Sequence, residues 1–170
     1  MLFDSTLLFY HATTSYAFTA GEFVSLVGST ANSASTAINL GNARDLGIGQ
    51  GAEDPTVVVV FGTAVTSSSS SMTLNIQFQG STDSTTWTTY METGTASTAS
   101  YLAGNVVTFK VPRRPPGVAL PLYYRLNTNI GPSPANNTAG ISTGTILAGI
   151  VLTPSELGTG GQYPAGFSVV

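Results

Sequence analysis

One segment of the chain constrains the secondary structure more firmly than any other. From residue 72 to residue 79, apolar side chains occupy every second position and polar side chains occupy the positions between them. Successive side chains of a β-strand point to opposite faces, so this alternation predicts a strand with one apolar face and one polar face. Residues 80–84 read Gly-Ser-Thr-Asp-Ser, which predicts a turn into a second strand over residues 87–92.

Further segments have strand character. A β-branched run over residues 56–61 predicts a strand buried on both faces, and Pro112 ends another strand at 106–111. We also expect strands at residues 37–40, 122–126 and 145–152, with a weaker one at 23–27. Many short strands, turn signals between them and almost no helical periodicity predict an all-β, antiparallel β-sandwich, and within that class a jelly roll.

The sandwich is expected to have an extension at each end. Residues 1–35 are interpreted as an N-terminal arm that begins with one helical turn, capped by Asp4 or Ser5, or is extended throughout. Residues 29–36 have no periodicity and are expected to be a flexible connection. Residues 36–154 form the jelly-roll body, and the glycine-rich residues 155–170 form a C-terminal tail. On this interpretation, removal of residues 1–30 leaves a folded body.

Charged side chains are scarce. The chain has 5 Lys and Arg and 8 Asp and Glu among 170 residues, where an ordinary soluble domain is about a quarter charged. A net charge of −3 gives no electrostatic reason to expect binding to nucleic acid or to an anionic membrane. No apolar run approaches the ~18 residues of a membrane span. The acidic Asp4 replaces the basic residues of a signal peptide, so we expect synthesis in the cytoplasm without individual export.

Motifs for catalysis are weak. Residues 140–144 match the G-x-S-x-G nucleophile elbow, but that motif needs a helix after it and a histidine partner, and the sole histidine is His11. We interpret the motif as a turn and expect neither an enzyme nor a cofactor. The glycine-rich residues 47–51 are expected to be a mobile loop. Asp45, Glu53 and Asp54 lack the alternating pattern of a calcium loop, so no metal site is expected and Asp45 should pair with Arg44 or cap nearby backbone.

Two other features could serve recognition. Residues 112–116 read Pro-Arg-Arg-Pro-Pro, which predicts a stiff loop that could present Arg113 and Arg114 to carboxylates or carbonyls of a partner. Trp87 and Tyr90 could form an aromatic platform for a sugar, although a Trp just after a turn in a sandwich more often belongs to the core.

The order of segments resembles that of the jelly-roll capsid cement, or decoration, proteins of tailed bacteriophages. The resemblance rests on the entry segment 38–49, a valine-rich strand, the strand and turn at 72–83 with Trp87, the Tyr-Tyr-Arg-Leu segment at 123–126, and the closing segment 146–154. It implies a structural protein on the outer surface of an icosahedral virion. Such a protein bridges neighbouring copies of the major capsid protein and resists the pressure of packaged DNA.

The resemblance also implies partners. Besides the major capsid protein, the chain is expected to bind copies of itself, as a dimer or a trimer on a symmetry axis. The residues expected to contact partners come from the arm, the proline-rich loop and the tail: Phe3, Leu8, Phe9, Tyr10, Arg113, Arg114, Tyr163 and Phe167. The alternative is a carbohydrate-binding β-sandwich module or tail-fibre domain that uses Trp87 and Tyr90.

Overall fold

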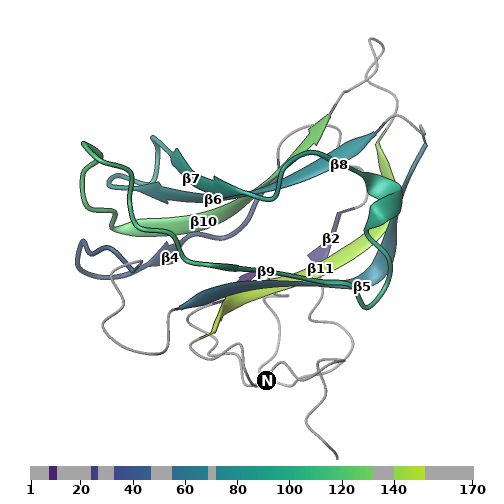
Figure 1. The fold of residues 1–170 in the computed structure, drawn as a ribbon, viewed down its shortest axis with the longest axis horizontal. Coiled ribbons are helices and arrows are strands. Elements are labelled where there is room, and N and C mark those ends of the chain that lie inside the picture. Colours follow the sequence, from purple (N-terminus) through teal and green to yellow (C-terminus); the bar gives the residue numbers. More distant parts are fainter. Residues whose placement is uncertain are drawn as a thin grey trace, which may run out of the picture.

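The computed structural model describes residues 8–10, 24–26, 33–46, 55–68, 72–131 and 140–151. These residues form two antiparallel β-sheets that face each other across a shared apolar core (Figure 1). The expected all-β, antiparallel architecture is therefore confirmed. Among the described residues, helical structure is limited to one 3-10 turn, Thr98–Ser100.

Each sheet is built on two long strands, with shorter strands at its edges. The strands of sheet A, in spatial order, are β1 (Leu8–Tyr10), β11 (Ile141–Val151), β5 (Thr56–Ser67) and β9 (Val106–Lys110), with β2 (Val24–Ser25) also paired to β11. The strands of sheet B are β3 (Ser33–Ala34), β10 (Tyr123–Gly131), β6 (Thr73–Ser81) and β7 (Thr88–Glu92), with β4 (Ile38–Asn39) paired to β10 and β8 (Ala96–Ser97) paired to β6. The long strands β11 and β5 pair at the centre of sheet A, and β10 and β6 pair at the centre of sheet B.

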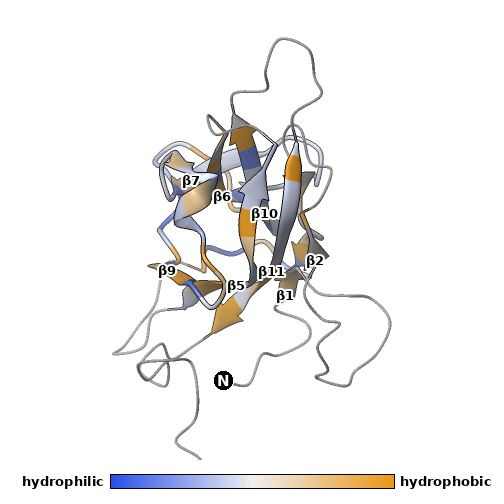
Figure 2. Cartoon of the chain, turned by 90° about the vertical axis from the view of Figure 1, so that its right-hand side faces the viewer, coloured by the Kyte–Doolittle hydropathy of each residue, from blue (hydrophilic) through white to orange (hydrophobic). Residues whose placement is uncertain are grey.

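The chain crosses between the sheets repeatedly, since β5, β9 and β11 belong to sheet A whereas β6, β7, β8 and β10 belong to sheet B. The described residues 40–46 and the segments 82–87 and 111–122 lie at one end of the sandwich, at the left of Figure 1. Figure 2 shows that the edge strands β7 and β9 lie on one side of the sandwich and β1 and β2 on the other.

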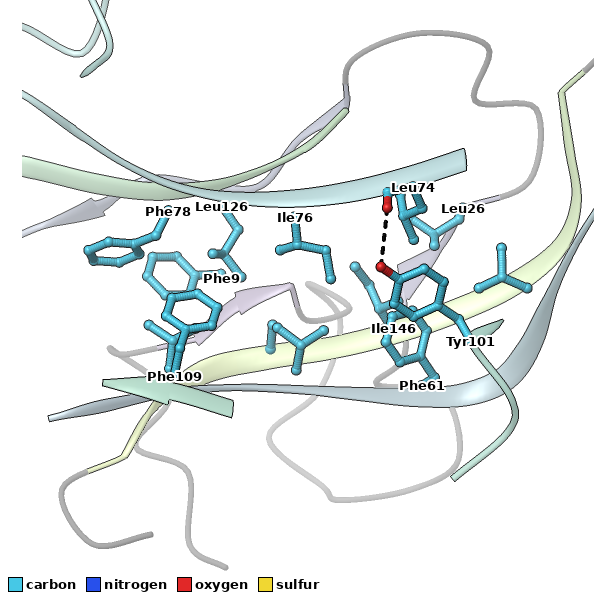
Figure 3. Packing of buried hydrophobic residues seen from close by; sticks show 14 of the residues in the cluster. Phe9, Leu26, Phe61, Leu74, Ile76, Phe78, Tyr101, Phe109, Leu126 and Ile146 are labelled. Carbon is cyan, nitrogen blue, oxygen red and sulfur yellow. Dashed lines mark hydrogen bonds between the residues drawn. The ribbon is translucent and has the colours of Figure 1, made fainter. Parts of the chain in front are cut away.

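The core follows from the alternation in β6. Met72, just before the strand, and Leu74, Ile76 and Phe78 within it are all buried against apolar side chains of sheet A, including Phe61 and Ile146 (Figure 3). The Tyr101 hydroxyl donates a hydrogen bond to the Leu74 carbonyl at 3.1 Å, which satisfies a polar group inside this core.

The valine-rich strand is buried on both of its faces along most of its first half, as its sequence predicts. Val57, Val59 and Phe61 belong to the core cluster. Val58 points away from that cluster and is nevertheless fully buried. Val60, its neighbour on the outer face, is half-buried.

The N-terminal segment departs from the expected arm. Phe9 in β1 is 1% exposed and lies edge-on to Phe78, with 6.1 Å between ring centroids. Leu26, just after β2, is equally buried. The prediction that Phe9 contacts a partner is therefore wrong, because its ring fills the core of its own chain. The described parts of residues 1–35 belong to the two sheets rather than to a separate arm.

Two further local expectations are corrected. Part of the segment expected to be flexible, residues 29–36, is strand β3, which pairs with Asn127 and Thr128 of β10. The G-x-S-x-G segment is expected to be a turn, but residues 141–144 lie in β11, where irregular register with β5 and a φ of +145° at Gly144 mark a bulged strand.

Candidate functional site

Three loops are joined by backbone hydrogen bonds at the end of the sandwich that lies at the left of Figure 1. The Leu122 amide donates to the Ser81 carbonyl at 2.8 Å, and the Leu40 amide donates to the Leu122 carbonyl at 3.0 Å. The Arg44 amide donates to the Pro121 carbonyl, also at 3.0 Å. Backbone hydrogen bonds therefore hold the loops after β4, β6 and β9 in one fixed arrangement.

This end collects every basic side chain of the chain. Lys110 is the last residue of β9 and pairs with Thr56, the first residue of β5. Arg125 lies near the beginning of β10, and the other three are in the connecting loops. We call this region the basic end and define it by Arg44, Lys110, Arg113, Arg114 and Arg125. Lys110 and Arg125 point outwards from opposite sheets, because their neighbours Phe109 and Tyr124 belong to the core. Two described carboxylates, Asp45 and Asp83, share the basic end, so the described side chains give it a net positive charge although the whole chain is negative.

The two arginines of the proline-rich loop differ in their surroundings. The Arg114 amide donates to Asp45 Oδ2 at 3.0 Å, and the Arg114 guanidinium donates to the Val118 carbonyl across the loop. Arg113 is exposed, whereas Arg114 is half-buried. Arg114 therefore fastens the loop, and Arg113 is the arginine that this loop presents to solvent.

Asp45 has a role that its sequence context does not predict. It accepts a hydrogen bond from the Arg114 amide, in a loop 69 residues further along the chain. The described residues contain no group of three or more side chains suited to hold a metal ion. Glu53 and Asp54 lie outside the described residues, as does the glycine-rich segment 47–51.

Two tyrosines, Tyr124 and Tyr90, pack between the core and the loops of the basic end. Tyr124 is fully buried and stacks on Phe78 with ring centroids 5.0 Å apart, and burial raises the pKa of its hydroxyl. That hydroxyl accepts a hydrogen bond from the Leu46 amide at 3.3 Å. Tyr90 meets both rings edge-on, and burial raises its pKa as well, with a smaller contribution from the Asp45 carboxylate. The loops of the basic end thus rest on a packed aromatic layer.

The outer face of sheet B carries a second polar feature, adjacent to Arg125. Hydrogen bonds link amide and charged side chains across three strands, and we call this set the polar ladder: Asn75, Gln77, Gln79, Glu92, Arg125 and Asn127. Arg125 Nε donates to Gln79 Oε1 at 2.8 Å. The amides of Asn75 and Gln77 both donate to Glu92 and lower the pKa of its carboxyl group. The ladder is therefore a layer of mutually hydrogen-bonded side chains in which Asn75, Gln79 and Asn127 are buried and only Glu92 is exposed.

Trp87 and Tyr90 do not form one aromatic platform. The Arg125 guanidinium lies 4.0 Å from the centroid of the Trp87 ring, so one face of this half-buried indole is occupied by a cation. Tyr90 lies on the opposite side of sheet B, against Phe78 and Tyr124 in the core. The expectation that Trp87 belongs to the core is not met either, because it packs on Arg125, outside the core cluster.

The remaining residues expected to contact partners are only partly placed. Leu8 and Tyr10 flank Phe9 in β1, which pairs with Ala148 and Gly149 of β11. Phe3, Tyr163 and Phe167 lie outside the described residues. Of the predicted contact residues, Arg113 and Arg114 are the two that lie at the basic end. The sequence did not indicate that Arg44, Lys110 and Arg125 would lie there too.

No family model matches the chain, and no curated protein matches it. In the part of the chain that the structure describes, no helix has the length and apolar character needed to cross a membrane.

Proposed function

We propose that this chain is a structural virion protein with a jelly-roll body. On this proposal it binds the outer surface of an icosahedral bacteriophage capsid, bridges neighbouring major capsid proteins and stabilises the shell against internal DNA pressure. The ordered resemblance of residues 38–154 to capsid cement proteins motivates the proposal. The strand orders β1–β11–β5–β9 and β3–β10–β6–β7 support it, because a jelly roll divides strands between two facing sheets in this alternating manner.

The observation that carries the proposal is the basic end. The five Lys and Arg residues all lie at or next to one end of the sandwich, although they are spread over positions 44 to 125, and Arg44 and Arg113 are exposed there. Clustered cations attract a surface of opposite charge and orient the approach of a partner. The docked surface would therefore carry carboxylates, and Arg113 would reach furthest towards them.

The rest of the described surface is suited to contact without strong charge. Most exposed side chains of the described residues are neutral, with Ser and Thr the commonest, and burying neutral polar groups against a matching surface avoids the desolvation penalty of ions. Many equivalent sites on a shell would multiply the effect of a modest individual affinity. A mostly uncharged contact surface and many equivalent binding sites both suit a protein that binds a repetitive protein lattice.

The experiment is co-sedimentation of the purified chain with empty shells of the phage that encodes it, prepared without this protein. We expect saturable binding at a fixed ratio to the major capsid protein and a raised melting temperature of the shell. R113E should weaken binding about fivefold or more, because an exposed ion pair worth up to ~1 kcal/mol becomes a repulsive pair. Raising the salt concentration should weaken the binding of the unaltered chain in the same direction.

The matched control is S100E/S142E, which changes the net charge by the same amount as R113E. Ser100 and Ser142 are exposed at the opposite end of the sandwich, so this variant should bind shells as the unaltered chain does. Equal losses in both variants would show that net charge, not the basic end, governs binding. A folded chain that does not bind shells would contradict the proposal and make glycan arrays the next experiment, with Trp87 as the candidate contact.

A further inference from the structure

The edge strands of the two sheets are not equally protected against pairing with another strand. A regular, uncharged edge strand is an open template for another strand, and proteins usually shorten, bulge or charge such edges. Among the described edge strands, β2, β3, β4 and β8 have two residues each, and β1 has three with an irregular register. β7 has five residues and an irregular register opposite Phe78 and Gln79.

β9 has none of these protections along most of its length. Its five residues pair with β5 in an unbroken register, from Thr56 with Lys110 to Val60 with Val106. The strand reads Val-Val-Thr-Phe-Lys, so its only charge is at its end, and the first proline follows at Pro112. Within the described residues, β9 pairs with β5 alone.

The hydrogen bonds on either side of β9 show which residues face its open edge. The Phe61 amide donates to the Asn105 carbonyl at 2.9 Å, and the Val111 amide donates to the Pro55 carbonyl at 2.8 Å. Backbone groups of an antiparallel strand alternate in direction, so residues 105, 107, 109 and 111 face β5. The backbone groups of Val106 and Thr108 therefore point away from β5, towards the open edge.

The edge strands β7 and β9 and the loop before β9 carry exposed apolar side chains. The described residues include four large hydrophobic side chains that are exposed, and three of them, Met91, Leu102 and Val106, lie on β7, on β9 or in the loop before β9. Both strands are on the same side of the sandwich in Figure 2. Single exposed apolar residues need no explanation, but here they accompany an unprotected strand edge.

We propose that β9 pairs with β9 of a second copy of this chain, antiparallel, with the two-fold axis at Thr108. In this register Thr108 lies opposite Thr108, and Val106 lies opposite Lys110, so the one charge of each strand is opposite a valine. A second copy is the occupant that the edge favours, because two-fold pairing uses both open edges at once and leaves none exposed. Sheet A would continue from one copy into the other, and Leu102 and Val106 would lie at the junction.

This proposal concerns the chain alone and does not depend on the proposed function. Its test therefore uses the purified full chain without shells. We expect light scattering after size exclusion to give twice the mass of one chain, with dissociation on dilution. A monomer at every accessible concentration would overturn the proposal.

A proline at position 108 separates pairing from folding. The Thr108 amide points away from β5, and a proline at such a position of an edge strand leaves the intrachain hydrogen bonds intact. T108P should therefore keep the circular dichroism spectrum of the unaltered chain and run as a monomer. A T108P protein that is folded and still dimeric would show that another surface holds the dimer.

Engineered cysteines test the register directly and keep the proposal falsifiable if T108P does not fold. The chain has no cysteine, so any disulfide in a single-cysteine variant joins two copies. Across a hydrogen-bonded antiparallel pair the Cα atoms are about 5.5 Å apart, within the range that a disulfide spans. T108C should therefore oxidise to a covalent dimer under mild conditions.

V106C is the matched control, on the same strand and the same face. In the proposed register the two copies of residue 106 are separated by four residues along the strand, about 13 Å, which is too far for a disulfide. V106C should stay reduced as a non-covalent dimer. The pairing at Thr108 would be refuted if V106C cross-linked as fast as T108C, or if neither variant cross-linked.

Discussion

Replacing Phe9 by alanine tests whether the first residues of the chain are part of the folded body. The ring is 1% exposed and lies edge-on to Phe78 at 6.1 Å. Burying a phenylalanine side chain is worth about 1.5–3 kcal/mol, and an edge-to-face aromatic pair adds about 0.5–1.5 kcal/mol. With the cavity that remains, F9A should lower the free energy of unfolding by about 3–5 kcal/mol.

The assay is urea denaturation followed by the fluorescence of Trp87, the only tryptophan. For a domain of this size each kcal/mol corresponds to about 2–4 °C, so the melting temperature should fall by roughly 6–20 °C. Leu120→Ala is the control, because Leu120 is exposed and its loss should change the free energy of unfolding by less than about 0.5 kcal/mol. An F9A loss below about 1 kcal/mol would refute the placement of Phe9 in the core and restore the interpretation of residues 1–35 as a separable arm.

Two further predictions concern the loops and strands around the basic end. A Cβ added at Gly80 would lie 2.6 Å from the Tyr90 ring, so G80A should lower the free energy of unfolding by about 1–3 kcal/mol, measured by thermal melts. The control is G131A, whose added Cβ would meet only a side-chain oxygen at 3.6 Å and should leave the stability nearly unchanged. Equal effects of the two substitutions would contradict this packing. Asp83 accepts the Thr86 amide at 2.8 Å, and this backbone contact, with others in the turn, holds the pKa of the carboxyl group well below its usual range. A lowered folded-state pKa stabilises the protein above the unfolded-state pKa, near 3.9, and this stabilisation is lost as the pH falls further. D83N should therefore reduce the loss of stability below about pH 4, and a variant that melts with the pH dependence of the unaltered chain would contradict the role of this turn.

The sequence predicted the strands whose signal is local. The alternation over residues 72–79 places Met72, Leu74, Ile76 and Phe78 in the core because side-chain direction in a strand depends only on position. The valine run at 56–61 likewise indicates burial on both faces. Their partners could not be predicted from the same patterns, since pairing depends on the register between distant segments.

The N-terminal segment shows why non-local pairing escapes sequence analysis. β1 has three residues, and the residues that it pairs with, Ala148 and Gly149, are about 140 positions away. Nothing in the three residues around Phe9 distinguishes an edge strand from an exposed arm. The G-x-S-x-G segment was misassigned for a related reason, because its glycines mark irregularities within a long strand rather than a turn.

The basic end was only partly predictable. The adjacent Arg113 and Arg114 are visible in the sequence, but Arg44, Lys110 and Arg125 join them only because the chain crosses repeatedly between the two sheets. The sequence did not predict the aromatic layer under these loops, since Tyr90 was considered only with Trp87, as the alternative of an aromatic platform. A strand register would have been needed to place Tyr90 against Phe78 and Tyr124.

The position of β10 and β11 in the sheets has a consequence for synthesis on the ribosome. These last two strands lie inside sheets B and A, where β10 separates β3 and β4 from β6, and β11 separates β1 and β2 from β5. The first four strands therefore have no described strand partner until residues 123–151 have been translated. At about 5–20 residues per second, Phe9 remains without its final neighbours for several seconds or more. A nascent chain stalled before residue 123 would expose this apolar ring, and we expect chaperones to bind such chains in preference to released ones.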